Sequence, residues 1–386
     1  MTKDPWDDPG WKRAAAEYHA TSAMEALSRA NGHDQDVAPH IELATLVDVV
    51  PESIEWLWPG RIARRKLTLI AGEPGLGKSQ LGVDIIAHLT TGSAWPDTGC
   101  APLGDAIILS AEDAINDTVR PRAEAASADL ERVHMVRSVL RPGAENQINE
   151  AMFSLLTDLD ALGSAITGFG GRVSLVMVDP ITAYLGDKID THKTAAVRSV
   201  LALLDQFAEK YNVAVAGISH PPKVVAGAKA INAITGSLAF VAAARIALLV
   251  VEDSDNEGRI LLLPVKNNLG RKASGLAYRM AQTIITNDII ASYLVWDPGE
   301  VAITANEALA NAAESAKDHN ALRDAKAFLV DWLANGPLPA KEIEEAAKAE
   351  SISERTLRRA RKDLGIIAGK QEFTGPWQWR LPDKAG

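Results

Sequence analysis

The sequence predicts an α/β protein with a mostly parallel central sheet, followed by a small α+β unit at the C-terminus. Short, continuous apolar runs alternate with helical patterns over residues 46–300, which is typical of parallel strands covered by helices on both faces. A glycine-rich turn joins an early strand to a helix. Residues 321–386 contain three helical patterns followed by two strand patterns, so we expect a second, smaller unit.

Composition and charge limit the class of protein. The chain has 386 residues, of which 47% are hydrophobic, so it can bury a sizeable core. Cys100 is the single cysteine, which excludes an internal disulfide framework and suits a reducing cytoplasm. The polar start of the chain has no apolar core of a secretion signal. The net charge of −10 argues against a generally basic coat for nucleic acid but allows a local basic channel.

The predicted elements follow in chain order. Residues 1–45 are charged and alanine-rich, and we expect a partly helical or flexible lead-in. The strands expected in the core are residues 66–71, 105–111, 173–179, 213–219, 245–251 and 260–266. The acidic segment 252–258 predicts a hairpin turn, and residues 283–297 predict a further edge hairpin. The apolar stretch 238–251 is short and contains Arg245, so we expect buried core and no membrane span.

The segment GEPGLGKS, Gly72 to Ser79, matches the phosphate-loop pattern G-x-x-x-x-G-K-[ST]. It follows an expected strand and precedes an expected helix at 79–92, so phosphates would meet the helix N-terminus. Lys78 would reach the β- and γ-phosphates of ATP, and the Ser79 hydroxyl would bind Mg²⁺. The residues expected to hold the nucleotide are Gly72, Glu73, Pro74, Gly75, Leu76, Gly77, Lys78, Ser79 and Gln80.

Polar residues at the ends of other strands complete the expected site. Asp179 ends a buried strand and would help to hold Mg²⁺; otherwise it is an ordinary strand-end aspartate. Glu112 follows the strand at 105–111 and is the candidate base that activates water, with Asp113 as its rival. Asp113 would also suit a helix N-cap. His220 ends a third strand, at the edge where ligands bind in α/β sheets, and is a candidate γ-phosphate sensor.

An ordered set of segments identifies a family resemblance over residues 56–285. The segments are WLWPGRI (56–62), GEPGLGKS (72–79), SAED (110–113), VDPITAYLGDKIDTHKTAAVR (178–198), ISHPPK (218–223), TGSLAFVAAAR (235–245) and VKNNLG (265–270). The chain resembles RecA-like P-loop ATPases of the plasmid RepA helicase type, including homologues from phages and mobile elements. The resemblance implies a RecA-like fold, ATP and Mg²⁺ as ligands, and a homo-oligomeric ring, expected to be a hexamer.

The family resemblance also implies a cation supplied by a neighbouring subunit. Arg245 best matches the family's arginine-finger position; otherwise it is a strand arginine paired with a carboxylate. Lys266 is a candidate second cation, but Asn268 stands where related ring helicases have an arginine. Lys223 and Lys229 follow the candidate sensor and would grip single-stranded DNA in the pore; otherwise they lie on a solvated loop.

The C-terminal residues predict a winged-helix-like unit over 321–386, after a connector at 301–320. Helical patterns at 324–336, 337–350 and 351–365 precede a strand–turn–strand pattern at 366–382. We expect Ser353 to cap the third helix and Gly365 to end it. This helix is rich in cations, and Arg355, Arg358 and Arg359 are the candidate DNA contacts. The unit resembles the winged-helix tail of related ATPases, although its mixed charge also suits a protein partner.

Trp377 and Trp379 alternate along the last expected strand. They therefore point to the same face of the sheet. We expect both indole rings to belong to the core of the unit, and not to form platforms for stacking bases.

The leading functional hypothesis is an ATP-hydrolysing, DNA-associated ring motor, a replicative helicase of a phage, plasmid or mobile element. Two alternatives stay open: a RecA-like DNA-binding switch or loader that does not unwind DNA, and a winged-helix regulator with slow ATP hydrolysis. A primase domain would need more residues before the core and a zinc-binding cysteine cluster, and the sequence has neither. A primase or initiator partner would therefore be a separate chain, and no membrane partner is expected.

Overall fold

The computed structural model describes residues 43–142, 147–186, 194–220, 230, 240, 243–370 and 376–382. The chain divides into two units, Met1–Ser53 and Ile54–Gly386. In the first unit, the described part contains a short 3-10 helix, η2 (Leu46–Asp48). The second unit contains the sheet, the site and the C-terminal elements, and all that follows concerns it.

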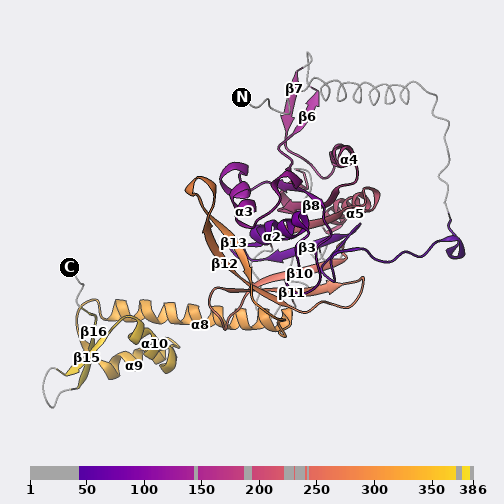
Figure 1. Ribbon diagram of the computed structural model, residues 1–386. Helices are drawn as coiled ribbons and strands as arrows, with labels where there is room; N and C mark the ends of the chain where they lie inside the picture. Colours follow the sequence, from indigo (N-terminus) through magenta and orange to yellow (C-terminus); the bar gives the residue numbers. More distant parts are fainter. Residues whose placement is uncertain are drawn as a thin grey trace. The chain divides into compact units, whose positions relative to one another are not determined.

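A nine-stranded sheet forms the centre of the second unit (Figure 1), with the strand order β13-β12-β11-β10-β3-β9-β8-β4-β5. Six neighbouring strands, from β10 to β5, run parallel, and β11, β12 and β13 continue the sheet antiparallel. The strands are β3 (Leu67–Gly72), β4 (Asp105–Ser110), β5 (Val133–Met135), β8 (Val173–Asp179), β9 (Ala214–Ser219), β10 (Ile246–Glu252), β11 (Arg259–Asn267), β12 (Leu276–Ile284) and β13 (Ile290–Trp296). This arrangement confirms the predicted α/β fold with a mostly parallel sheet.

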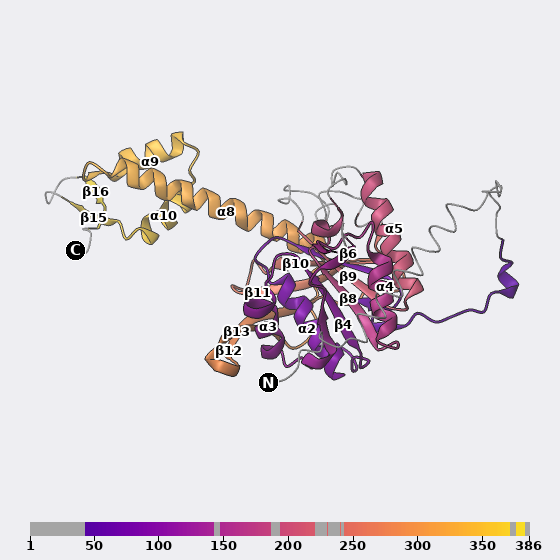
Figure 2. The same cartoon turned by 90° about the horizontal axis from the view of Figure 1, so that it is seen from above.

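Helices cover both faces of this sheet, as Figure 2 shows. On one face lie α2 (Lys78–Thr91) and α3 (Arg120–Ala125); on the other lie α4 (Leu159–Gly168) and α5 (Thr194–Lys210). Two apolar clusters, one on each face, contain the alternate side chains of the parallel strands. The strands are apolar throughout because both of their faces are buried.

Smaller elements complete this part of the chain. They are β1 (Trp56–Trp58), β2 (Ile62–Ala63), the π-helix η3 (Ile115–Val119), η4 (Leu130–Arg132), β6 (Val139–Pro142), β7 (Ile148–Ala151), η6 (Ile181–Tyr184) and η7 (Thr286–Asp288). β1 pairs with β2, and β6 with β7, in two separate hairpins.

The edge hairpin is longer than predicted. The sequence predicted a hairpin over 283–297, but β12 begins at Leu276 and pairs with β11 as well as with β13. Its turn places Asn287 and Asp288 at positive φ, a conformation that these two residue types tolerate better than most. The early part of β12 has a buried side at Tyr278, which only its position in the sheet explains.

One long helix, α8 (Ala305–Trp332), replaces the expected connector and first C-terminal helix. Its N-cap is a capping box in which Thr304 and Glu307 satisfy each other's backbone amides. Its first turns pack on the apolar cluster beside α4 and α5 through Ala305, Ala308 and Leu309. The predicted break near residue 320 was therefore wrong, because the alanine-rich sequence continues as helix.

The C-terminal elements have a separate apolar cluster. After α8 come β14 (Leu338–Pro339), α9 (Ala340–Ala349), α10 (Glu354–Asp363), β15 (Ile367–Lys370) and β16 (Trp377–Arg380), and the strands form a sheet in the order β14-β16-β15. The Ser353 hydroxyl accepts a hydrogen bond from the amide of Thr356, and Gly365 has a φ of 63°. The predicted start and stop of this helix are thus confirmed.

The expectation for the two tryptophans was half wrong. Trp379 is 4% exposed and belongs to the C-terminal core, whereas Trp377 is 57% exposed. Trp379 pairs with Leu338 on one side and Ala368 on the other, but the two-residue β14 ends before it reaches Trp377. The short edge strand therefore leaves one of two similar side chains uncovered.

Candidate functional site

The phosphate loop connects β3 to α2 in a conformation that depends on its glycines. Gly72 ends β3, and a Cβ atom there would lie 2.2 Å from the carbonyl oxygen of Val250 on the neighbouring strand. Gly75 and Gly77 have φ values of 85° and 70°, which glycine adopts without strain. Gly77 then caps α2, which begins at Lys78. The loop thus directs backbone amides toward a phosphate at the helix N-terminus.

Lys78 is held inside this loop. Its side chain is buried, and its Nζ donates a 2.7 Å hydrogen bond to the carbonyl oxygen of Glu73. Burial lowers the pKa of the ammonium group to about 8, against the opposing effect of three nearby carboxylates. These carboxylates are Asp179, Glu112 and Glu73. The lysine is therefore positioned at the loop before any phosphate binds.

Asp179 and Ser79 lie together at the end of β8 and the start of α2. Burial raises the pKa of Asp179 to about 6, although a hydrogen bond with Ser79 lowers it. The Oδ1 atom of Asp179 is buried and, among the described residues, has no hydrogen-bond partner. A hydroxyl and a carboxylate with a spare oxygen suit Mg²⁺, which uses one or two protein ligands together with phosphate oxygens.

Glu112 and His220 face each other across the ends of β4 and β9. The Nε2 atom of His220 lies 3.6 Å from the Oε2 atom of Glu112, which is 61% exposed at its side chain. Burial and the positive charge of Lys78 lower the pKa of His220, whereas Glu112 raises it. The histidine is thus favoured in its neutral form. The structure places both predicted residues close to Lys78.

Asp113, the rival of Glu112, has a different partner. Its Oδ2 atom accepts a 2.7 Å hydrogen bond from Nη1 of Arg122 on α3, and its amide donates to the Ser110 hydroxyl. This carboxylate is therefore already neutralised, while Glu112 points to His220. No pattern in the sequence pointed to Arg122, which lies nine residues further along the chain.

The β12–β13 hairpin supports the phosphate loop, and sequence reasoning missed it. The hydroxyl of Tyr278 donates to the carbonyl oxygen of Leu76 at 3.1 Å. Gln80, 1% exposed, accepts a hydrogen bond from Ser292, and its Nε2 atom has no partner within the described part of the chain. These contacts join residues about 200 positions apart, so no local pattern could reveal them.

Arg245 does not join the site within one chain. It precedes β10 at the edge of the sheet opposite the phosphate loop, and its guanidinium lies 3.8 Å from Asp205. β10 runs beside β3 from Ile246 to Val250, which pairs with Gly72; at about 3.3 Å a residue, this separation exceeds the length of an arginine side chain. Lys266 lies at the same edge and donates to the carbonyl oxygen of Ala244.

The expected nucleic-acid contacts lie elsewhere. Lys223 and Lys229 are outside the described residues. Arg355 and Arg358 are exposed on α10, and Arg359 lies 3.8 Å from Asp318 on α8. The three arginines therefore belong to the C-terminal elements, which have an apolar cluster of their own.

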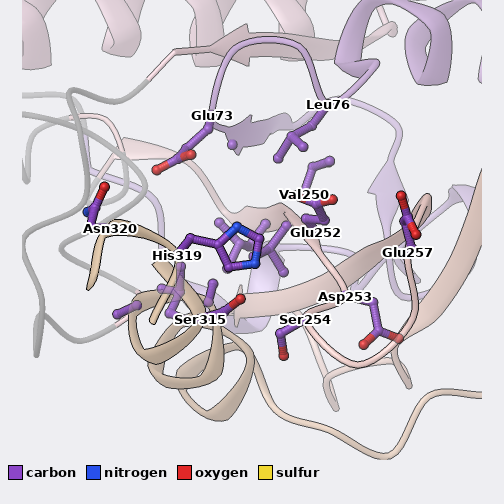
Figure 3. Close-up of a pocket in the computed structure, with 16 residues that line it drawn as sticks. Glu73, Leu76, Val250, Glu252, Asp253, Ser254, Glu257, Ser315, His319 and Asn320 are labelled. Carbon is purple, nitrogen blue, oxygen red and sulfur yellow. The ribbon is translucent and has the colours of Figure 1, made fainter. Parts of the chain in front are cut away.

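A cavity of about 760 Å³ lies beside the phosphate loop (Figure 3), between the end of β10 and α8. Figure 3 shows Glu73 of the loop and His319 of α8 on its walls. Its other acidic lining residues are Glu252, Asp253 and Glu257. Lys78, Ser79 and Asp179 do not line it. Its acidic walls are unsuited to phosphates, so this cavity is distinct from the candidate site.

Comparisons with known proteins agree with a nucleotide-binding domain. Residues 37–226 match the family model described as AAA domain. A search of curated proteins returned no match. Among solved structures, a chain whose title describes it as an ATPase domain matches with 10% sequence identity and a TM-score of 0.43, over 68% of this chain and 94% of that chain. No helix in the described residues has the length and apolar character required to span a membrane.

The matched region contains the phosphate loop, Glu112, Asp179 and His220. These residues lie at the carboxyl ends of β3, β4, β8 and β9, where an α/β sheet binds its ligand. The chain therefore contains an ATPase domain of the P-loop class, similar over residues 37–226 to the AAA domain family.

Proposed function

We propose that the chain is an ATP-hydrolysing, DNA-associated ring motor, a replicative DNA helicase of a phage, plasmid or mobile element. The observation that carries the proposal is the grouping of Lys78, Glu112 and His220 at one edge of the sheet. A carboxylate that faces a strand-end histidine beside the phosphate loop suits hydrolysis coupled to movement. The ordered set of sequence segments extends the proposal from an ATPase to a helicase.

Each residue has a role in the proposed reaction. Glu112 orients a water molecule and accepts its proton as the water oxygen attacks the γ-phosphorus, and the bond from that phosphorus to the bridging oxygen of ADP breaks. Lys78 leaves the Glu73 carbonyl and stabilises the negative charge of the β- and γ-phosphates. Ser79 and Asp179 would hold Mg²⁺, which neutralises charge on the phosphate oxygens when it is bound.

His220 connects the site to the segment that follows β9. It lies close to Glu112 and precedes residues 221–229 directly. We propose that it senses the γ-phosphate and that Lys223 and Lys229 contact single-stranded DNA. Lysines on such a segment would bind phosphates without reading sequence.

A ring would supply the missing cation. Arg245 lies at the opposite edge of the sheet from the phosphate loop, so it can reach a nucleotide only in another copy of the chain. We propose that it does so in a closed, head-to-tail ring, where each site receives a residue from its neighbour. Lys266 lies next to it and is the candidate second cation.

The C-terminal elements follow the order helix, strand, helix, helix, strand, strand. We propose that they form a winged helix in which α10 is the recognition helix and Arg355, Arg358 and Arg359 contact duplex DNA. The exposed positions of Arg355 and Arg358 support this role. A separate primase or initiator is the protein partner that the proposal requires.

The test measures ATP hydrolysis with and without single-stranded DNA, followed by strand separation on a forked duplex. We expect DNA to stimulate hydrolysis, and wild-type protein to separate strands only with ATP. Stimulation without strand separation would favour a switch or loader. Hydrolysis that ignores DNA, together with ATP-independent binding to a specific duplex, would favour a winged-helix regulator and contradict the motor.

A further inference from the structure

Trp377 is an exposed aromatic side chain in an otherwise well-packed unit. It lies at the start of β16 and is 57% exposed, although Trp379 on the same face of the strand is buried. The ammonium group of Lys370 on the paired strand lies 5.5 Å from the ring centroid of Trp377. Since exposed tryptophans are uncommon in folded domains, this ring is a candidate contact for a partner molecule.

A hollow of about 390 Å³ adjoins this tryptophan. Its charged lining residues are Lys341, Glu344 and Arg361, and its aromatic ones are Trp377 and Trp379. The guanidinium of Arg361 lies 4.9 Å from the ring centroid of Trp379, which fixes it at the floor. Two cations and one carboxylate line the hollow, so its net charge favours an anionic occupant.

Arg361 also lines a second concave surface, of about 760 Å³, along α10. The cations of that surface are Arg355, Arg358, Arg359, Arg361 and Lys362. The hollow and the basic surface therefore meet at Arg361. A chain of phosphates that follows the α10 cations would place its next residue beside Trp377. The pairing of a cationic track with an aromatic ring is typical of sites for single-stranded nucleic acid.

We propose that Trp377 stacks on an unpaired base of a single-stranded nucleic acid, while Arg361 holds the adjacent phosphate. Both faces of an internal base in a duplex are covered by neighbouring bases, so only an unpaired or terminal base offers a free face to the indole. The apolar ring accepts any base, because every base has a π-face. This surface would bind the strand next to a duplex contacted by α10.

The proposal rests on the proposed nucleic-acid contact of α10, and its test separates the two. Binding of a labelled oligothymidylate to full-length wild type, Trp377→Leu and Trp377→Phe is measured by fluorescence anisotropy without ATP. A backbone of abasic residues with equal charge serves as the second probe, and a blunt duplex as the third. Trp332→Leu is the matched control, since Trp332 is a partly exposed tryptophan at the end of α8.

We expect Trp377→Leu to bind oligothymidylate about 5- to 100-fold more weakly, the range for loss of one stacked base. Trp377→Phe keeps a ring and should stay within about threefold of wild type, as should Trp332→Leu. The abasic probe and the duplex should bind all four proteins alike, since they offer no free base to stack.

Three results would overturn the proposal. Wild-type affinity of Trp377→Leu for oligothymidylate would show that the ring contributes nothing. Equal losses for all three probes would indicate a structural role. A proline-rich peptide that binds wild type but not Trp377→Leu, with nucleic-acid binding unchanged, would assign the hollow to a protein partner. None of these results would alter DNA-stimulated ATP hydrolysis, so the motor proposal would stand separately.

Discussion

The two charged regions of this molecule differ in how their charges are held. At the ATPase edge, Lys78 is 3% exposed and Asp179 is 6% exposed, and each shifts the pKa of the other. On α10, Arg355 and Arg358 are exposed to solvent. Buried charges interact strongly and need fixed geometry, whereas exposed charges interact through a screened field. One region is therefore suited to chemistry and the other to contact with a polyanion.

This difference predicts two kinds of response to mutation. A substitution at the ATPase edge leaves a buried partner uncompensated and should change the rate by orders of magnitude. A substitution on α10 removes one of several exposed charges and should change affinity by a modest factor that depends on salt. Four predictions test this contrast, from the largest expected effect to the smallest.

Arg245→Ala should reduce ATP hydrolysis by about 10³- to 10⁵-fold, the range for a cation supplied by a neighbour. Lys78→Ala should abolish hydrolysis as well, through the other side of the same site. In an equal mixture, about a quarter of the sites would combine an intact Lys78 with a neighbour's intact Arg245. Steady-state hydrolysis by the mixture should therefore recover to a measurable level.

Two results would contradict the shared site. One is a wild-type rate for Arg245→Ala. The other is a mixture as inactive as each variant alone, under conditions where the subunits exchange. Lys66→Ala, which removes a lysine paired with Glu209 on the surface, is the control and should hydrolyse ATP at the wild-type rate.

Glu112→Gln should lower the rate of hydrolysis by about 10²- to 10⁴-fold and leave ATP binding intact, because the amide cannot accept the proton of water. Asp113→Asn is the matched variant, since Asp113 is paired with Arg122. It should cost less than about tenfold, through a small shift of the segment. Single-turnover hydrolysis and equilibrium binding of ATP measure the two effects. The reverse order of the two rates would assign the base to Asp113.

The double variant Arg355→Gln and Arg358→Gln should weaken duplex binding at moderate salt. The slope of log affinity against log salt should fall by about 1 for each arginine removed. Lys317→Gln, on the exposed part of α8, is the control for loss of a cation outside α10. Anisotropy titrations over a salt series give the slopes. A slope unchanged in the double variant would remove α10 from the DNA contact.

Asp84→Asn tests a buried carboxyl group with no place in the chemistry. Burial raises the pKa of Asp84 to about 7, although Trp296 donates a hydrogen bond to its Oδ2 atom. The folded protein therefore holds a proton that the unfolded chain releases at lower pH, so wild-type stability falls as pH rises from about 4 to 7. The stability advantage of Asp84→Asn should grow by about 1.4 kcal/mol for each pH unit in that window.

Urea unfolding of the two proteins at a series of pH values measures this advantage. The asparagine retains an oxygen that can accept the hydrogen bond from Trp296, so the comparison isolates the charge. A constant difference across the series would show that folding does not raise the pKa of Asp84.

The residues of the phosphate loop were predictable because they are contiguous. Gly72, Gly77, Lys78 and Ser79 carry out local geometry and local chemistry. The strand ends that present Glu112, Asp179 and His220 could also be located, because parallel strands place their carboxyl ends at one edge. Sequence patterns indicated the order of these segments, and the roles of the residues stay predictions.

The partners of these residues could not be predicted. Arg122 binds Asp113 across a helix that begins with a π-turn, and Tyr278 supports Leu76 from about 200 residues away. The length of β14 decided that Trp377 is exposed while Trp379 is buried. Each of these facts depends on which segments meet in space.

The sequence by itself therefore determined the fold class, the phosphate loop and the strand ends that carry polar residues. Hydrophobic periodicity and glycine conformation are local properties, and both are written in neighbouring residues. Only the tertiary structure decided that Glu112 faces His220, that Arg245 lies at the far edge, and that Trp377 remains uncovered. Pairing and burial depend on contacts between distant segments, which no local pattern specifies.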